Sequence, residues 1–148
     1  MNESHVVLHS GTEHSRIVPL TAEHFTIDPT ALDVDLCRLA AVMIEYAEVE
    51  VELGAEVERR EAALQRWDAD QDLAIRSTPG ESGARVTETR IQSMVRVHPD
   101  RATLVERLVE SKRNHNLMRW VMRAMQGKKD CLIALTYREK ALIQSERY

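Results

Sequence analysis

Apolar residues recur at alternating spacings of four and three between residues 32 and 74, a pattern typical of a coiled-coil helix. The thirteen positions of this heptad are Leu32, Leu36, Leu39, Met43, Tyr46, Glu50, Leu53, Val57, Arg60, Leu64, Trp67, Gln71 and Ala74. Ten of them are apolar or Ala. A seam of this length predicts a helix of about 45 residues, and a helix that long needs a partner helix to bury its stripe. Polar Glu50, Arg60 and Gln71 on the seam are expected to fix its register.

The start of this helix is predicted at "DPTALD", residues 28–33. Asp28 is a good N-cap, and Pro29 suits the first helical position because its missing N–H has no partner there. The segment "STPGESGARV" (77–86) contains one proline and two glycines and therefore predicts a break.

A second, short helix is predicted from Thr87, with Val86 and Ile91 placed as a hydrophobic staple around its cap. The segment "VHPD" (97–100) ends that helix, because the residue before a proline is pushed out of the helical region. Pro99 can then open a third helix that runs towards the C-terminus.

These elements predict an all-α fold: a long antiparallel helical hairpin with a short intervening helix, preceded by a flexible N-terminal arm. The arm is residues 1–27, and the helical hairpin domain is residues 28–148. Residues 1–27 have no sustained hydrophobic period. The spacing of His5 and His9 suits a metal site only on a helix, and nothing else indicates a helix there. A loosely ordered arm is the preferred interpretation.

Composition supports this interpretation, since the chain is poor in glycine and aromatic residues. Its net charge of −4 hides an asymmetry. Residues 1–84 carry six Lys and Arg against seventeen Asp and Glu, whereas residues 85–148 carry fourteen against seven. An acidic segment facing a basic one, or a basic half reserved for an anion, is therefore expected.

Several classes of protein are disfavoured. The longest apolar run, residues 39–44, is far too short to span a membrane, and the N-terminus has no pattern of a secretory signal. Cys37 and Cys131 have no metal-binding or redox spacing, which indicates a reduced, cytoplasmic protein. No P-loop, GxSxG or HExxH motif is present, and His98 is expected to be a cap or surface residue. We expect no enzyme activity, metal or cofactor.

The third helix combines apolar and basic residues in "MRWVMRAMQGKKDCLIAL" (118–135). On a helical wheel, the apolar residues fall in one broad arc: Leu117, Trp120, Val121, Ala124, Met125, Cys131, Leu132 and Leu135. Lys112, Arg119 and Arg123 cluster on the opposite side, with Arg101 in line, and Lys128 falls on the apolar side. Both tryptophans, Trp67 and Trp120, fit apolar arcs, so core packing is preferred to stacking on nucleic-acid bases.

No acid lies three or four residues from Arg119 or Arg123, so they lack the usual pairing within a helix. Two interpretations remain open. These arginines can pair with glutamates of the first helix (Glu45, Glu48, Glu52 and Glu56) or be solvated, or they can contact phosphates.

Three stretches, "DLAIRS" (72–77), "VTETRIQSMVRVHPD" (86–100) and "RAMQGKKDCLIAL" (123–135), resemble the UvsY-like recombination mediators of tailed phages. The resemblance covers roughly residues 35 to 140. It implies a non-enzymatic all-α protein that forms homo-oligomers and binds single-stranded DNA. Its partners would be a RecA-like recombinase, which it helps to load, and a single-strand-binding protein. The family carries a Lys-x-Arg element late in the long helix, where this sequence has Arg66 and Arg76 without that element.

The expected nucleic-acid contacts are Arg66, Arg76, Arg85, Lys112, Arg119, Arg123, Lys128 and Lys129. The expected oligomer interface is Leu36, Met43, Leu53, Val57 and Leu64, on the heptad seam. The alternative to a mediator is a coiled-coil adaptor with no role in nucleic-acid binding. A mediator requires a basic stripe open to solvent, whereas an adaptor requires a stripe paired with glutamates of the first helix.

Overall fold

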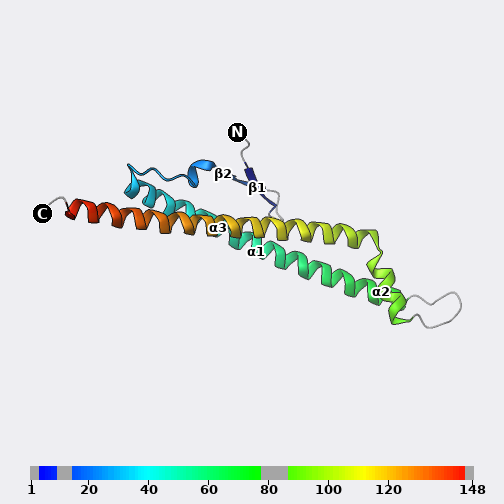
Figure 1. Ribbon diagram of the computed structural model, residues 1–148. Coiled ribbons are helices and arrows are strands. Elements are labelled where there is room, and N and C mark those ends of the chain that lie inside the picture. The colour runs from blue at the N-terminus through cyan, green and yellow to red at the C-terminus, as the bar shows by residue number, and fades with distance from the viewer. Residues whose placement is uncertain (1–3, 10–14, 78–86, 146–148) are drawn as a thin grey trace. The chain divides into compact units, whose positions relative to one another are not determined.

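The computed structural model describes residues 4–9, 15–77 and 87–145, and it is dominated by α-helix (Figure 1). Helix α1 spans Leu32–Ser77, α2 spans Glu88–Arg96 and α3 spans Pro99–Ser145. Two strands, β1 (Ser4–His9) and β2 (Ser15–Leu20), and a single-turn helix, η1 (Ala22–His24), precede them. The predicted all-α class is confirmed for the body of the chain, and α1 has 46 residues, close to the expected length.

The chain forms two compact units, and the boundary between them falls inside α1 and inside α3. The first unit contains Met1–Leu53 and Asn114–Tyr148, and the second contains Gly54–Arg113. In each unit a segment of α1 packs with a segment of α3. Their antiparallel direction is evident in the second unit, where the earlier α1 residue Glu61 meets Lys112 and the later Asp68 meets Arg101.

The first unit has a core built almost entirely from α1 and α3. Its buried members are Leu32, Leu39, Tyr46, Val49 and Leu53 of α1 and Met118, Val121, Met125 and Leu132 of α3. These positions follow spacings of three, four and seven, which is the knobs-into-holes pattern of a narrow helix–helix seam. Leu36 and Met43 pack against this cluster from its edge.

In the first unit the predicted heptad row of Leu32, Leu39, Tyr46 and Leu53 is buried, whereas the predicted row of Leu36, Met43 and Glu50 is only partly buried. Val49 is completely buried, at 0% exposure, whereas the predicted seam residue Glu50 is only partly buried. Two heptad frames, meaning two neighbouring rows of α1 residues, could face the core. The hydrophobic pattern alone does not decide between them, because one frame contains Leu36 and Met43 and the other contains Val42 and Val49. Packing Val49 inwards avoids the desolvation of the Glu50 carboxylate. The same frame buries Asp35, at 8% exposure, whose Oδ2 accepts a hydrogen bond of 2.8 Å from the backbone N–H of Asp28.

Helix α1 begins at Leu32, three residues later than the prediction that placed Pro29 at the first helical position. The Asp28 side chain is engaged in a local turn, where its Oδ1 accepts hydrogen bonds from the backbone N–H (2.9 Å) and the hydroxyl (2.6 Å) of Thr30. These two bonds lower the pKa of Asp28, the hydroxyl bond contributing most. The first bond of the helix instead runs from the N–H of Asp35 to the carbonyl of Ala31, at 2.9 Å.

Strands β1 and β2 pair antiparallel, with Val6 opposite Val18. We did not expect them from the sequence. Their β-branched residues, "VV" in β1 and "IV" in β2, favour strands, but each run is too short to outweigh the polar residues around it. The boundary at residue 27 and the flexibility of the arm stay predictions.

In the second unit, α2 and the start of α3 are as expected. Ile91 and Val95 are the buried residues of α2, and Thr87 precedes its first residue in an extended conformation. Val86, the other half of the predicted staple, lies outside the described residues. His98 is a helix cap as predicted: its Nδ1 accepts the backbone N–H of Asp100 at 3.2 Å. Its ring also meets that of Trp67 edge-on, with 5.1 Å between centroids.

None of the described helices combines the length and the apolar character that a membrane span requires.

Candidate nucleic-acid interface

The outward side of α3 in the first unit presents Arg119, Trp120 and Arg123, which we call the α3 outer face. All three side chains are exposed, and Trp120 is 65% exposed. The core seam determines this placement. Because Met118, Val121 and Met125 point into the core, the residues between them are carried towards solvent.

Within the α3 outer face, Arg123 and Trp120 are in contact. The guanidinium carbon of Arg123 lies over the Trp120 ring, 5.1 Å from its centroid. Side chains on a helix lean towards its N-terminus, so a residue three positions later reaches back over the ring. The attraction of the cation to the ring face holds the two groups together at a cost in flexibility.

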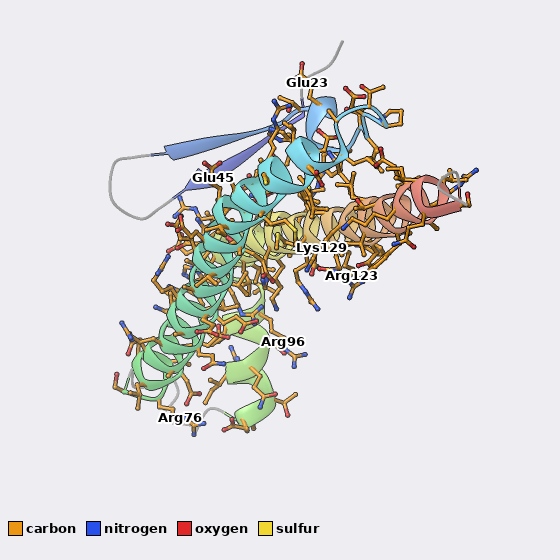
Figure 2. The ribbon with its side chains drawn as sticks, turned by 90° about the vertical axis from the view of Figure 1, so that its left-hand side faces the viewer. Glu23, Glu45, Arg76, Arg96, Arg123 and Lys129 are labelled. Atoms are coloured by element: carbon orange, nitrogen blue, oxygen red, sulfur yellow. The ribbon has the colours of Figure 1, made fainter. Side chains whose placement is uncertain are left out.

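Arg119 and Arg123 form no ion pair or hydrogen bond with any residue that the structure describes. Arg123 and Lys129 both project from α3 in Figure 2. Among the described residues of the first unit, no Asp or Glu of α1 pairs with either arginine, and the Glu50 carboxylate instead lies 3.6 Å from Nε2 of His115 on α3. The positive charge of the α3 outer face is therefore available to an external anion.

Basic residues of the second unit behave differently. Lys112 pairs with Glu61 at 2.6 Å, and Arg101 binds Asp68 through two hydrogen bonds of 2.8 and 3.2 Å. The bond to Asp68 raises the pKa of Arg101. This part of the predicted stripe thus matches the paired interpretation, although its partners are not the glutamates that we expected.

The remaining candidate DNA contacts near the end of α1 differ in whether they are paired with acids. Arg76 bonds Asp72 at 2.9 Å and also bonds Glu88, and these two carboxylates raise its pKa. Arg66 is exposed and has no partner in the described part of the chain. Arg85 lies outside the described residues.

Lys128 does not belong with the exposed basic residues. It is 9% exposed, and its Nζ donates a hydrogen bond of 3.2 Å to the carbonyl of His24. Its place on the apolar side of the wheel was predicted, and the structure has the aliphatic stem inside with the amine reaching a backbone acceptor. Lys129 is exposed.

Trp120 corrects a sequence-based expectation, because we preferred to place it in the core. The apolar arc on the wheel was too broad: Leu117 and Trp120 are 43% and 65% exposed. The observed seam instead includes two polar residues, Ser111 and Lys128, at 5% and 9% exposure. One signal in the sequence could have predicted that Trp120 is exposed. The seam spacing of 118, 121, 125, 128 and 132 is narrower than the apolar arc, and it leaves position 120 outside the core.

The predicted oligomer interface is mostly occupied within the chain. Leu53 is 4% exposed in the core, and Leu36 and Met43 pack against it. Val57 and Leu64 are partly buried. A different side of α1 carries exposed apolar side chains, with Val34, Ile44 and Val51 at 58%, 64% and 70%.

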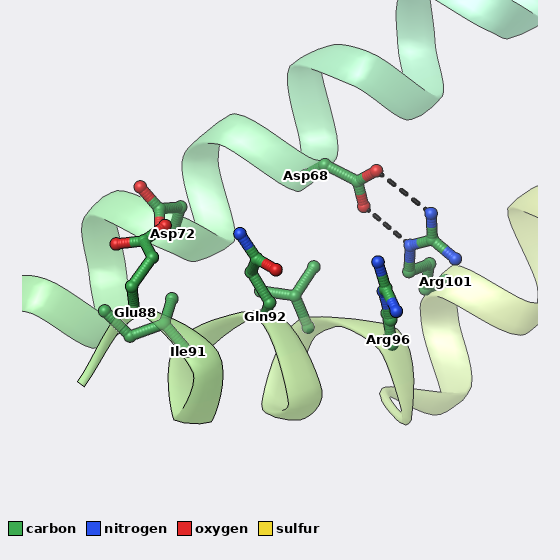
Figure 3. A pocket seen from close by; sticks show the side chains of 8 residues that line it. Asp68, Asp72, Glu88, Ile91, Gln92, Arg96 and Arg101 are labelled. Atoms are coloured by element: carbon green, nitrogen blue, oxygen red, sulfur yellow. Dashed lines mark hydrogen bonds and ion pairs between the residues drawn. The ribbon is translucent and has the colours of Figure 1, made fainter. Parts of the chain in front are cut away.

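A pocket of about 330 Å³ lies in the second unit (Figure 3). Its lining is Asp68, Asp72, Glu88, Ile91, Gln92, Val95, Arg96 and Arg101. Within the lining, Arg101 is paired with Asp68, as the dashed bonds show (Figure 3), and Asp72 and Glu88 are paired with the neighbouring Arg76. The pocket therefore has less unpaired positive charge for an external anion than the α3 outer face has.

Among the described residues, no group of three His, Cys, Asp or Glu side chains is arranged to hold a metal ion. Cys37 and Cys131 are free and exposed. Comparison with known proteins adds nothing to this geometry, because no family model, no curated protein and no solved structure matches the chain.

Proposed function

We propose that this protein binds single-stranded DNA through the α3 outer face. The observation that carries the proposal is the pair of arginines, Arg119 and Arg123, which are exposed, have no acidic partner in the described part of the chain and flank an exposed tryptophan. Arginine guanidinium groups bind phosphate oxygens well, and single-stranded DNA is bound by combining such groups with aromatic side chains.

The adaptor alternative predicts that the basic stripe is paired with α1. That pairing holds for Lys112 and Arg101 in the second unit. It does not hold for Arg119 and Arg123, even though α1 carries eight Asp or Glu residues against one Arg between residues 32 and 58. Charges left without partners beside so many acids favour an external anion over a purely structural role.

We further propose that DNA binding serves the loading of a RecA-like recombinase in the cytoplasm. Support for this role is the resemblance of residues 72–77, 86–100 and 123–135 to phage recombination mediators. The expected activity is faster assembly of recombinase on DNA already covered by a single-strand-binding protein. A protein that binds DNA but leaves that assembly rate unchanged would be a binding module without a mediator role.

The DNA-binding proposal is tested by the salt dependence of binding to a labelled oligothymidine. Each phosphate contact releases counterions, so the logarithm of affinity should fall against the logarithm of salt with a slope of about −0.7 per contact. Replacing Arg119 and Arg123 together by Ala should reduce the magnitude of this slope by about 1.4 and weaken binding at low salt.

The matched control replaces Arg90 and Arg107, which are exposed and lie in the second unit, by Ala. It removes the same charge from elsewhere and should leave the slope close to that of the parent. Equal slopes for all three proteins would exclude the α3 outer face as the contact surface. No salt-sensitive binding by the parent would exclude the DNA-binding proposal itself.

A further inference from the structure

We infer that Trp120 is a stacking platform for an unpaired nucleic-acid base, so that the α3 outer face selects single strands over duplex DNA. This inference rests on the proposed function and deepens it, because it assigns a base contact in addition to the phosphate contacts. An indole ring can stack on any base, so the contact would distinguish strandedness without reading sequence.

The position of Trp120 gives a base room to approach. The side chain is 65% exposed on a helix whose seam leaves position 120 outside. The residues one and two turns further along its side of α3 are Ala124 and Gly127, both small. Apart from its two chain neighbours and the backbone of its own helix, no atom lies within 4 Å of where a Cβ on Gly127 would stand. This row of α3 therefore carries only small residues on the C-terminal side of Trp120 as far as Gly127.

Arg123 prepares the ring for this role. Its guanidinium carbon lies 5.1 Å from the centroid of Trp120, so the ring is already held in a favoured orientation before a ligand arrives. An indole has two faces, and one guanidinium covers only one of them. A base on the second face would place its own phosphates within reach of the Arg119 and Arg123 side chains.

The alternative occupant of an exposed tryptophan is a second copy of the chain. Charge argues against it, because α3 carries six basic residues against two acidic ones between residues 114 and 145. Two such surfaces facing each other would repel. A nucleic acid supplies the opposite charge together with flat apolar faces, which suits both parts of the α3 outer face.

The test uses the full chain with Trp67 replaced by Phe, which keeps an aromatic ring beside His98. The sequence has two tryptophans, so the emission of this variant reports Trp120. Three ligands of equal length are titrated: oligothymidine, an abasic phosphodiester strand, and a blunt duplex. Oligothymidine should quench Trp120 strongly, and the abasic strand should bind about tenfold more weakly with little quenching.

Substitutions at position 120, made in the otherwise unchanged chain, complete the experiment. Trp120→Leu should weaken oligothymidine binding about tenfold and abolish its advantage over the abasic strand, while Trp120→Phe should keep most of that advantage. Both variants should retain the salt slope of the parent, because the arginines remain. Circular dichroism checks that helicity is unchanged, as expected for an exposed position.

Three results would overturn the inference. Equal affinity for oligothymidine and the abasic strand would leave only phosphate contacts, and the proposed function would survive. Unchanged binding by Trp120→Leu would place the base contact elsewhere. Quenching that depends on protein concentration without any DNA would assign Trp120 to self-association.

Discussion

Lys128 is a charged residue on a core seam, and its environment explains how it is tolerated. It lies between the buried residues Met125 and Leu132, and its amine reaches the carbonyl of His24. His24 in turn shares a 2.7 Å hydrogen bond with the Tyr46 hydroxyl. The lysine thus joins the segment before α1 to the helical core of the first unit.

Substitution of Lys128 separates its stem from its charge. Lys128→Met keeps an apolar stem of similar length, so the free energy of unfolding should fall by no more than about 1.5 kcal/mol, the typical worth of one hydrogen bond. Lys128→Ala also removes packing and should cost about 2–3 kcal/mol. Urea denaturation followed by circular dichroism measures both. Equal losses for Met and Ala would show that the bond to His24, and not the stem, is the main contribution.

Glu56 gives the second unit a dependence on pH. Burial raises its pKa, but hydrogen bonds from Arg60 and Arg59 outweigh that effect and leave the pKa below its usual value of 4.5. Because the folded pKa is lowered, the contribution to stability is present above the unfolded pKa and is lost as pH falls through the folded pKa.

Glu56→Gln should therefore remove part of the decrease in stability on acidification below about pH 4.5. The cost at pH 7 should be about 1 kcal/mol or less, since the partner Arg59 is largely exposed. Urea denaturation of parent and variant at pH 7 and pH 3 gives the comparison. An identical decrease in both proteins would mean that other carboxylates dominate.

At the scale of elements, helix lengths and caps were predictable because they depend on local chemistry. Pro99 at the start of α3 and the His98 cap were expected and are found. The start of α1 was not, because Asp28 had a competing partner in Thr30. Strands β1 and β2 were missed because their stability comes from pairing with each other, which no single run of residues reveals.

The frame of the α1 seam could not be read from the pattern, since both frames are largely apolar. A pair of neighbouring substitutions tests the frame that forms. Val49→Ala should lower the free energy of unfolding by about 1–3 kcal/mol, because Val49 is fully buried. Glu50→Ala should cost about 0.5 kcal/mol or less, because its contact with His115 is long and partly exposed. Urea denaturation of both variants measures these losses. A larger loss for Glu50→Ala than for Val49→Ala would show that the predicted frame, with Glu50 on the seam, is the one that forms.

At the scale of the whole molecule, the charge asymmetry between the halves of the chain was predictable, but its use was not. Lys112 and Arg101 of the second unit are paired with acids of α1, whereas Arg119 and Arg123 of the first unit have no acidic partner among the described residues. Local spacing had identified Arg119 and Arg123 as lacking acids within their own helix. Whether acids of α1 would reach them depended on packing, which the sequence left open.

Self-association is also a property of the whole molecule, and we expect it on the exposed side of α1. Val34, Cys37, Ala41, Ile44, Glu48 and Val51 follow spacings of three and four and are all exposed. This second heptad row has no partner among the described residues, and an exposed apolar row of this kind is typical of an interface. An antiparallel pairing of two such rows would bring Val34 of one copy to Val51 of the other.

Replacing Ile44 and Val51 together by Glu should lower the mass measured by light scattering at micromolar concentration while helicity stays unchanged, because both residues are at least 64% exposed. Leu53→Glu serves as the contrast. Leu53 is 4% exposed, so a buried charge there should unfold the first unit rather than only dissociate it. A monomeric parent would remove the case for this interface. A multimeric parent whose mass is unaffected by the double substitution would place the contact on another surface, with Leu117 and Trp120 of α3 the next to test.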